Sequence, residues 1–262
     1  MPVVVSRDER PEGGRLAQVT IDNRAKLNTL DRALMIEIVE TIARLEADRE
    51  LRLVVLRGAG ERAFVGGANL DELAALNRDT ARDFITLVHR VCDGFRRLPV
   101  PVVARIDGYA LGAGLELAAA CDLRVASERS HFGMPEVRVG IPSVVEAALL
   151  PQLIGEGRAR RLILTGETID AATALQWGLV DATATPTALD AEVERFAAAL
   201  LAGGREALRI QKSLMADWQD LSTSAAIARG IDAFAAAHEG DEPRRMAAAR
   251  LAEMRARRTG RR

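Results

Sequence analysis

The chain has 262 residues, a length that suits one large domain or one domain with a small appendage. Hydrophobic residues make up 48% of it and aromatic residues only 3%, so a sizeable core must be built from Ala, Val, Leu and Ile. The 36 basic and 37 acidic residues nearly cancel, which argues against a general binder of nucleic acids or membrane surfaces, because such proteins carry a basic excess.

The cysteines and histidines indicate neither a metal site nor a redox site. Cys92 and Cys121 have no partner at a metal-ligand or redox spacing, so both are expected to be core residues in a reducing compartment. His89, His131 and His238 lie far apart in the sequence. The apolar N-terminal run is too short for a signal-peptide core, and no apolar stretch approaches the length of a membrane span. We therefore expect a cytoplasmic protein.

Strands and helices alternate over the first half of the chain. The apolar patterns predict strands at residues 16–21, 51–56, 102–106, 123–126 and 131–134. They predict helices at residues 31–49, 80–97 and 115–120, the first of them with Asp31 as N-cap. This alternation suggests parallel strand pairing through helical crossovers.

Beyond Pro142 the strand signal disappears and helical periodicity takes over. Helices are predicted at residues 149–154, 158–164, 171–177, 191–201, 206–218 and 242–258. This helical half is expected to pack on a partner subunit or to cover the core. The basic residues at 255–262 are interpreted as a solvated, partly disordered tail.

Two glycine-rich loops each follow a strand and lead into a helical stretch, at residues 63–70 (AFVGGANL) and 108–118 (GYALGAGLELA). Free N–H groups at a helix start suit an anion. The two loops could converge on one oxygen as an oxyanion hole, or each could be a tight turn. A Rossmann pattern fails at Leu117, where a glycine is needed, and a P-loop fails because Gly112 is followed by Ala113 and Gly114.

Two carboxylates stand among apolar residues. Glu116 lies in the run AGLELAAA, where the first turn of a helix would stabilise its charge, and Glu136 follows Pro135. A buried charge is costly unless it reaches solvent, a partner or a cavity. Each glutamate could pair with an arginine, Arg124 or Arg138, or the two together could form a general acid/base pair beside the oxyanion site.

Taken together, these segments resemble the crotonase, or enoyl-CoA hydratase/isomerase, family. The resemblance covers roughly residues 15–235 and is carried by residues 24–30 (RAKLNTL), 63–70, 108–122, 132–136 (FGMPE) and 177–180 (WGLV). It implies an α/β fold, with a spiral of ββα turns in residues 1–200 that contains the acyl-CoA site. It also implies a helical C-terminal region, residues 201–262, that drives assembly of a homotrimer or a dimer of trimers.

The resemblance also implies roles for particular residues. The backbone N–H groups of Ala68 and Ala113 would hold the thioester oxygen, and Glu116 and Glu136 would move protons. The residues expected to bind coenzyme A or substrate are Lys26, Leu27, Asn28, Val65, Gly67, Asn69, Leu70 and Gly112. Coenzyme A is then part of the substrate, and neither a separate cofactor nor a metal is expected.

Members of the family with both glutamates resemble hydratases. The expected reaction is therefore reversible hydration of a 2-enoyl-CoA to a 3-hydroxyacyl-CoA through an enolate. The alternatives are double-bond isomerisation, hydrolysis of an acyl-CoA, and a non-catalytic member that binds acyl-CoA.

Three features depart from the family pattern. Asn69 stands where the first loop commonly has Asp, and residues 141–147 (IPSVVEA) replace a run of Pro, glycines and Thr. Within this segment, Glu146 could be a helix first-turn residue or a substrate-selecting group. The chain also lacks the family's common Lys-Arg-x-Pro ending, so no coenzyme A contact can be assigned to the C-terminus.

Overall fold

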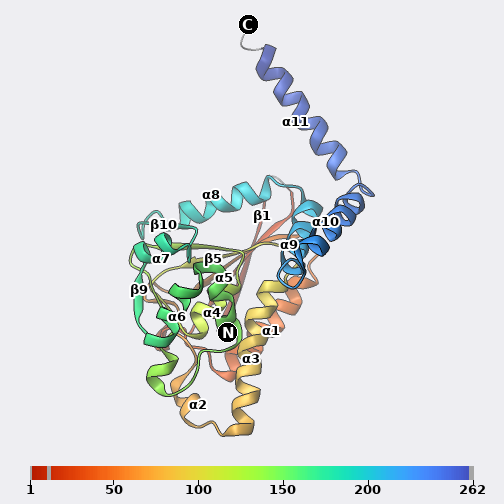
Figure 1. The fold of residues 1–262 in the computed structure, drawn as a ribbon. Coiled ribbons are helices and arrows are strands. Elements are labelled where there is room, and N and C mark those ends of the chain that lie inside the picture. The colour runs from red at the N-terminus through yellow and green to blue at the C-terminus, as the bar shows by residue number, and fades with distance from the viewer. Residues whose placement is uncertain (1, 11–12, 260–262) are drawn as a thin grey trace. The chain divides into compact units, whose positions relative to one another are not determined.

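The computed structural model describes residues 2–10 and 13–259, with the backbone alone for residues 258–259. The chain divides into two compact units, Met1–Ala198 and Ala199–Arg262. The first unit is a mixed α/β structure and the second is helical (Figure 1).

The first unit contains two sheets, of which the larger has six strands among the described residues. Among the described residues its strand order is β1-β2-β3-β5-β7-β10. The bounds are β1 Val3–Glu9, β2 Arg15–Ile21, β3 Leu51–Gly58, β5 Val102–Ile106, β7 Leu123–Ser127 and β10 Ala182–Ala184. β1 pairs antiparallel with β2, and the other neighbours are parallel. Almost all of β3 is buried, as expected for a parallel strand covered on both faces.

A second sheet of short strands stands beside the first. In the described chain its order is β4-β6-β8-β9, with bounds β4 Ala63–Val65, β6 Tyr109–Leu111, β8 His131–Gly133 and β9 Thr168–Asp170. β4, β6 and β8 run parallel, and β9 pairs antiparallel with β8. The chain thus repeats one pattern: a strand of the larger sheet, a strand of the smaller sheet, then a helix. The ββα spiral expected from the sequence is confirmed.

Helices and 3-10 turns connect the strands of the first unit. They are η1 Arg24–Lys26, α1 Arg32–Glu46, α2 Leu70–Ala74, α3 Arg78–Arg97, α4 Ala113–Ala120, η2 Pro135–Val139, η3 Val145–Leu149, α5 Leu150–Ile154, α6 Glu156–Thr165 and α7 Ala171–Trp177. After β10 the chain continues into α8 Leu189–Leu201, whose last residues belong to the second unit. α1 and α3 lie side by side (Figure 1). The side chain of Asp31 accepts a hydrogen bond from the Leu34 amide, so the predicted N-cap of α1 is confirmed.

The core is aliphatic, as the low aromatic content required. Apolar residues at helical spacing on α1 and α3 are buried; they are Leu34, Ile38, Ile42, Leu45, Phe84, Leu87, Val91 and Phe95. All eight residues of α4 are buried, so this helix passes through the core and carries Glu116 into it.

The structure corrects two predictions about secondary structure. The expectation that strands end after Pro142 is wrong, because β9 and β10 follow it. Each has three residues, too few to show a period-2 pattern, and side chains in both are only partly covered. The glycine segments were also predicted as loops throughout, but β4 and β6 lie within or next to them.

The second unit is helical, with α9 Arg205–Asp217, α10 Thr223–Ala237 and α11 Glu242–Thr259. The tail predicted to be partly disordered is helical through Thr259, and residues 260–262 lie outside the described residues. Within the described chain, no helix combines the length and apolar character needed to cross a membrane.

Candidate active site

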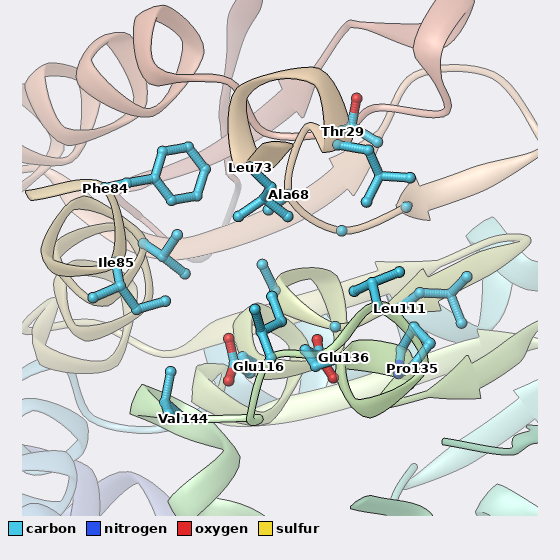
Figure 2. Close-up of a pocket in the computed structure, with 18 of the residues that line it drawn as sticks. Thr29, Ala68, Leu73, Phe84, Ile85, Leu111, Glu116, Pro135, Glu136 and Val144 are labelled. Atoms are coloured by element: carbon cyan, nitrogen blue, oxygen red, sulfur yellow. The ribbon is translucent and has the colours of Figure 1, made fainter. Parts of the chain in front are cut away.

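A cavity of about 400 Å³ in the first unit brings together the segments singled out from the sequence. Its walls come from the two glycine loops, the segment of residues 24–30, α2, α3, η2 and the residues before η3 (Figure 2). Most of the lining is apolar. Glu116 and Glu136 are the acidic side chains among the described lining residues, and Arg138 is the basic one.

The glycines of both loops allow close backbone approach. A Cβ on Gly67, whose φ is +108°, would lie 3.1 Å from the carbonyl oxygen of Leu111 in the other loop. A Cβ on Gly114 would lie 2.0 Å from the carbonyl oxygen of Val65 in β4. Only glycine permits these approaches, so the two loops are held against each other by residues that lack a side chain.

Ala68 and Ala113 both line the cavity, one from each loop. Ala113 is the first residue of α4, where a helix leaves its N–H groups without an internal partner. Neither amide donates a hydrogen bond to another described residue. Two residues with unpartnered amides in the wall of one cavity match the composition of an oxyanion hole.

Glu116 is in the first turn of α4, as expected, and only 4% of its surface is exposed. Its Oε1 accepts a hydrogen bond of 3.3 Å from the Ala147 amide, and the amide of Val144 also donates a hydrogen bond to this carboxyl. Burial, and after it the negative charge of Glu136, raise the pKa of Glu116 from 4.5 to about 8. Near neutral pH this carboxyl therefore holds a proton.

Glu136 lies in η2 directly after Pro135 and is half-buried. The hydroxyl of Ser143 donates a 2.7 Å hydrogen bond to its Oε2. A Cβ on Gly112 would come within 2.2 Å of Oε1, so Gly112 makes room for the carboxyl. Figure 2 shows Glu116 and Glu136 next to each other on the wall that faces Ala68.

The alternative of arginine pairing does not hold for either glutamate. Arg124 donates to the carbonyl oxygens of Leu179 and Cys121 and pairs with Asp181. Arg138 donates to the carbonyl oxygen of Thr165. Both glutamates instead face the cavity, with hydrogen bonds from the segment 143–147.

The predicted coenzyme A residues separate into three groups: four line the cavity, one is exposed and three are buried. Leu27, Gly67, Leu70 and Gly112 line the cavity. Lys26 is exposed and is not among the residues that line it.

The remaining three are buried. Asn28 donates to the carbonyl oxygens of Ala59 and Ala63, Asn69 accepts from the Glu72 amide as the N-cap of α2, and Val65 belongs to the core. These contacts hold the first glycine loop in place.

Sequence reasoning missed several residues of the site. Ser143 lies in the segment 141–147, whose departure from the family pattern was the only signal in the sequence. That departure does not predict that the Ser143 hydroxyl donates a hydrogen bond to Glu136. The apolar wall contributed by α2 and α3 includes Leu73, Phe84, Ile85 and Val88. Of these, Phe84 also belongs to the buried apolar face of α3.

The comparison with known proteins identifies the family. Residues 12–257 match the family model described as enoyl-CoA hydratase/isomerase. The chain belongs to this family. The match covers both compact units and includes every segment of the cavity.

Individual members of the enoyl-CoA hydratase/isomerase family are similar along most of the chain. A short-chain-enoyl-CoA hydratase of Clostridium acetobutylicum is 35% identical over 222 residues, 84% of this chain and 85% of the relative. A crotonyl-CoA hydratase of Syntrophomonas wolfei is 31% identical and 88% of each chain is covered. The crystal structure of an enoyl-CoA hydratase from Bacillus anthracis superposes with a TM-score of 0.91 over 97% of each chain, at 28% identity.

Proposed function

We propose that this protein adds water reversibly to the double bond of a 2-enoyl-CoA thioester and forms a 3-hydroxyacyl-CoA. The observation that carries the proposal is the pair of neighbouring glutamates, Glu116 and Glu136, in a cavity that is also lined by Ala68 and Ala113, whose amides have no partner among the described residues. The relatives named as hydratases support the same reaction. Coenzyme A would enter as part of the substrate, with no separate cofactor.

In this proposal the thioester oxygen accepts hydrogen bonds from the amides of Ala68 and Ala113. These donors stabilise the negative charge that develops on the oxygen when the enolate forms. Loss of one such donor typically costs about 3 to 4 kcal/mol of transition-state stabilisation. The apolar wall from α2 and α3 would receive a hydrocarbon acyl group.

The two glutamates would hold one water molecule between them. Glu136 takes a proton from the water as the oxygen forms its bond to Cβ of the substrate, and the π electrons move onto the thioester oxygen. Glu136 then returns that proton to Cα as the enolate collapses. Glu116, protonated near neutral pH, donates a hydrogen bond that orients the water. Water is consumed and no other reactant is needed.

The experiment compares wild type with Glu136→Gln on a conjugated enoyl-CoA, whose absorbance falls on hydration. We expect kcat to fall about 10²- to 10⁴-fold because the proton carrier is lost, with thioester affinity nearly unchanged. Glu128→Gln, an exposed carboxyl outside the cavity, is the matched control and should behave like wild type. Unchanged turnover in Glu136→Gln would remove this residue from the mechanism.

A panel of acyl-CoA thioesters read by mass spectrometry separates the reaction classes. Addition of one water with the thioester intact supports hydration. Release of free coenzyme A would indicate hydrolysis, and a new isomer of equal mass would indicate isomerisation. Binding without any conversion over the whole panel would indicate a non-catalytic member.

The homotrimer, or dimer of trimers, and the cytoplasmic location are also proposals. Exposed apolar side chains on α10, Ile227, Ile231 and Phe234, support assembly through the second unit. Cys92 and Cys121 are buried and reduced, which fits a reducing compartment.

A further inference from the structure

A second buried acidic group lies behind the two glutamates of the cavity. Glu146 is 6% exposed and does not line the cavity. Its Oε1 is 2.7 Å from Nδ1 of His89 in α3, and its Oε2 is buried without a hydrogen bond to any described residue. A buried carboxyl with a single side-chain partner is costly, so the position of Glu146 directly before Ala147 calls for an explanation.

The segment that carries Glu146 surrounds the carboxyl of Glu116. The backbone amides of Val144 and Ala147, on either side of Glu146, both donate hydrogen bonds to that carboxyl. Val145 between them has a φ of +40°, which is rare for a β-branched residue. The Ala147 amide also donates to the Val144 carbonyl oxygen at 2.9 Å, so the turn is closed on itself. Such a turn persists only when neighbouring contacts hold it.

We propose that Glu146 is a positioning residue: held by His89, it fixes the backbone of residues 144–147 around the Glu116 carboxyl and keeps a negative charge behind it. In Figure 2, Val144 and Glu116 lie close together at one end of the cavity. This proposal rests on the proposed hydratase function in one respect only, namely that Glu116 takes part in proton transfer.

The charge of Glu146 acts on Glu116 in the direction that this role requires, toward keeping the Glu116 carboxyl protonated. The charge of Glu146 raises the pKa of Glu116, after the larger effects of burial and of Glu136. Burial likewise raises the pKa of Glu146, and the hydrogen bond from His89 opposes that rise. The titratable side chains that act on this pair of carboxyls are Glu136 on η2 and His89 and Asp93 on α3. The two carboxyls in turn raise the pKa of the buried Cys92 thiol, after the larger effect of burial.

The first experiment follows the protonated carboxyl band of Glu116 by infrared spectroscopy as a function of pH, in the protein without substrate. Its loss in Glu116→Gln assigns the band. In Glu146→Gln, which keeps the shape but not the charge, we expect the midpoint to move to lower pH by roughly half a unit or more. The control Glu156→Gln removes an exposed carboxyl and should leave the midpoint in place.

The second experiment compares His89→Ala with His89→Asn, whose amide can replace the ring Nδ1. His89→Ala should lower kcat about tenfold with KM nearly unchanged, and His89→Asn should restore most of it. Thermal unfolding of each variant confirms that it is folded.

The inference is overturned if Glu116 titrates alike in Glu146→Gln and Glu156→Gln, or if both His89 variants keep the wild-type kcat. The infrared midpoint needs no turnover. A shifted midpoint in a protein without hydratase activity would therefore refute the proposed function and leave the electrostatic coupling of Glu146 to Glu116 intact.

Discussion

The buried carboxyl of Glu116 makes the stability of this protein depend on pH. The folded protein keeps a proton on Glu116 up to about pH 8, whereas the unfolded chain releases it near pH 4.5. The stability that comes from this proton is full below pH 4.5 and is lost as the pH rises through about 8. The loss is on the order of 3 to 5 kcal/mol.

Glu116→Gln should remove this dependence. The amide has the same shape and no proton to release, so the variant should gain stability relative to wild type as the pH rises from about 5 to about 9. Urea unfolding at both ends of this range measures the difference. Parallel stability curves for the two proteins would show that the pKa of Glu116 is not raised.

Val145 shows that the site contains backbone strain as well as buried charge. A β-branched residue at a φ of +40° costs about 1 to 3 kcal/mol, and such residues cluster at functional sites. The segment 141–147 was recognisable from the sequence as a departure from the family pattern. Its strained turn was not, because nothing in the residue types Val-Val-Glu predicts a positive φ.

At the scale of single elements, α2 illustrates how a capping residue shapes the cavity. This helix has five residues, too few to be stable alone, and two of them, Leu70 and Leu73, line the cavity. Asn69 begins it by accepting the amide of Glu72 at 3.0 Å. The sequence suggested that Asn69 binds coenzyme A, but its buried side chain contacts the backbone of this helix.

Asn69→Ala should therefore act on stability and on substrate affinity together. We expect a loss of about 1 kcal/mol in the free energy of unfolding and a higher KM, because α2 loses its N-cap. Asn69→Asp retains a capping oxygen and is the matched control. Chemical unfolding and steady-state kinetics measure both quantities. If Asn69→Asp is impaired as much as Asn69→Ala, the side-chain amide group of Asn69 is required for a reason other than capping α2.

The three-residue strands, all of them missed by the sequence patterns except β8, share a physical cause. β4, β6, β8, β9 and β10 contain three residues, or one and a half periods of a strand. Each becomes a strand only because a neighbouring strand pairs with it. Local periodicity indicated β8 alone, whereas the longer strands of the larger sheet, such as β3, carry their own apolar pattern.

At the scale of the whole molecule, the second unit points to assembly. Ile227, Ile231 and Phe234 recur on one face of α10 and are 61%, 66% and 72% exposed in the single chain. Side chains of this kind at helical spacing favour burial against another surface.

We therefore predict a particle mass near three times, or six times, the 28.3 kDa of the chain. Light scattering after size-exclusion chromatography measures it. Phe234→Asp should shift the particle toward monomer, because a charge in an apolar interface is costly. Leu164→Asp, equally exposed at 72% but on α6 in the first unit, serves as the control. A wild-type monomer at micromolar concentration would contradict the prediction.

The sequence by itself determined the family, the alternation of strands and helices, and the identity of the two glutamates. These depend on local patterns: apolar periodicity, glycines before helices, and charges among apolar residues. Contacts between residues far apart in the chain cannot be predicted in this way, because a cavity leaves no local pattern in the sequence.

Only the tertiary structure decided what surrounds those glutamates. Folding places Ala68 and Ala113 in one cavity, gives Glu136 the hydroxyl of Ser143, and sets Glu146 against His89. The last contact joins residues 57 apart in sequence. Burial raises the pKa of Glu116, and burial depends on how α4 passes through the core, which no segment of the chain encodes alone.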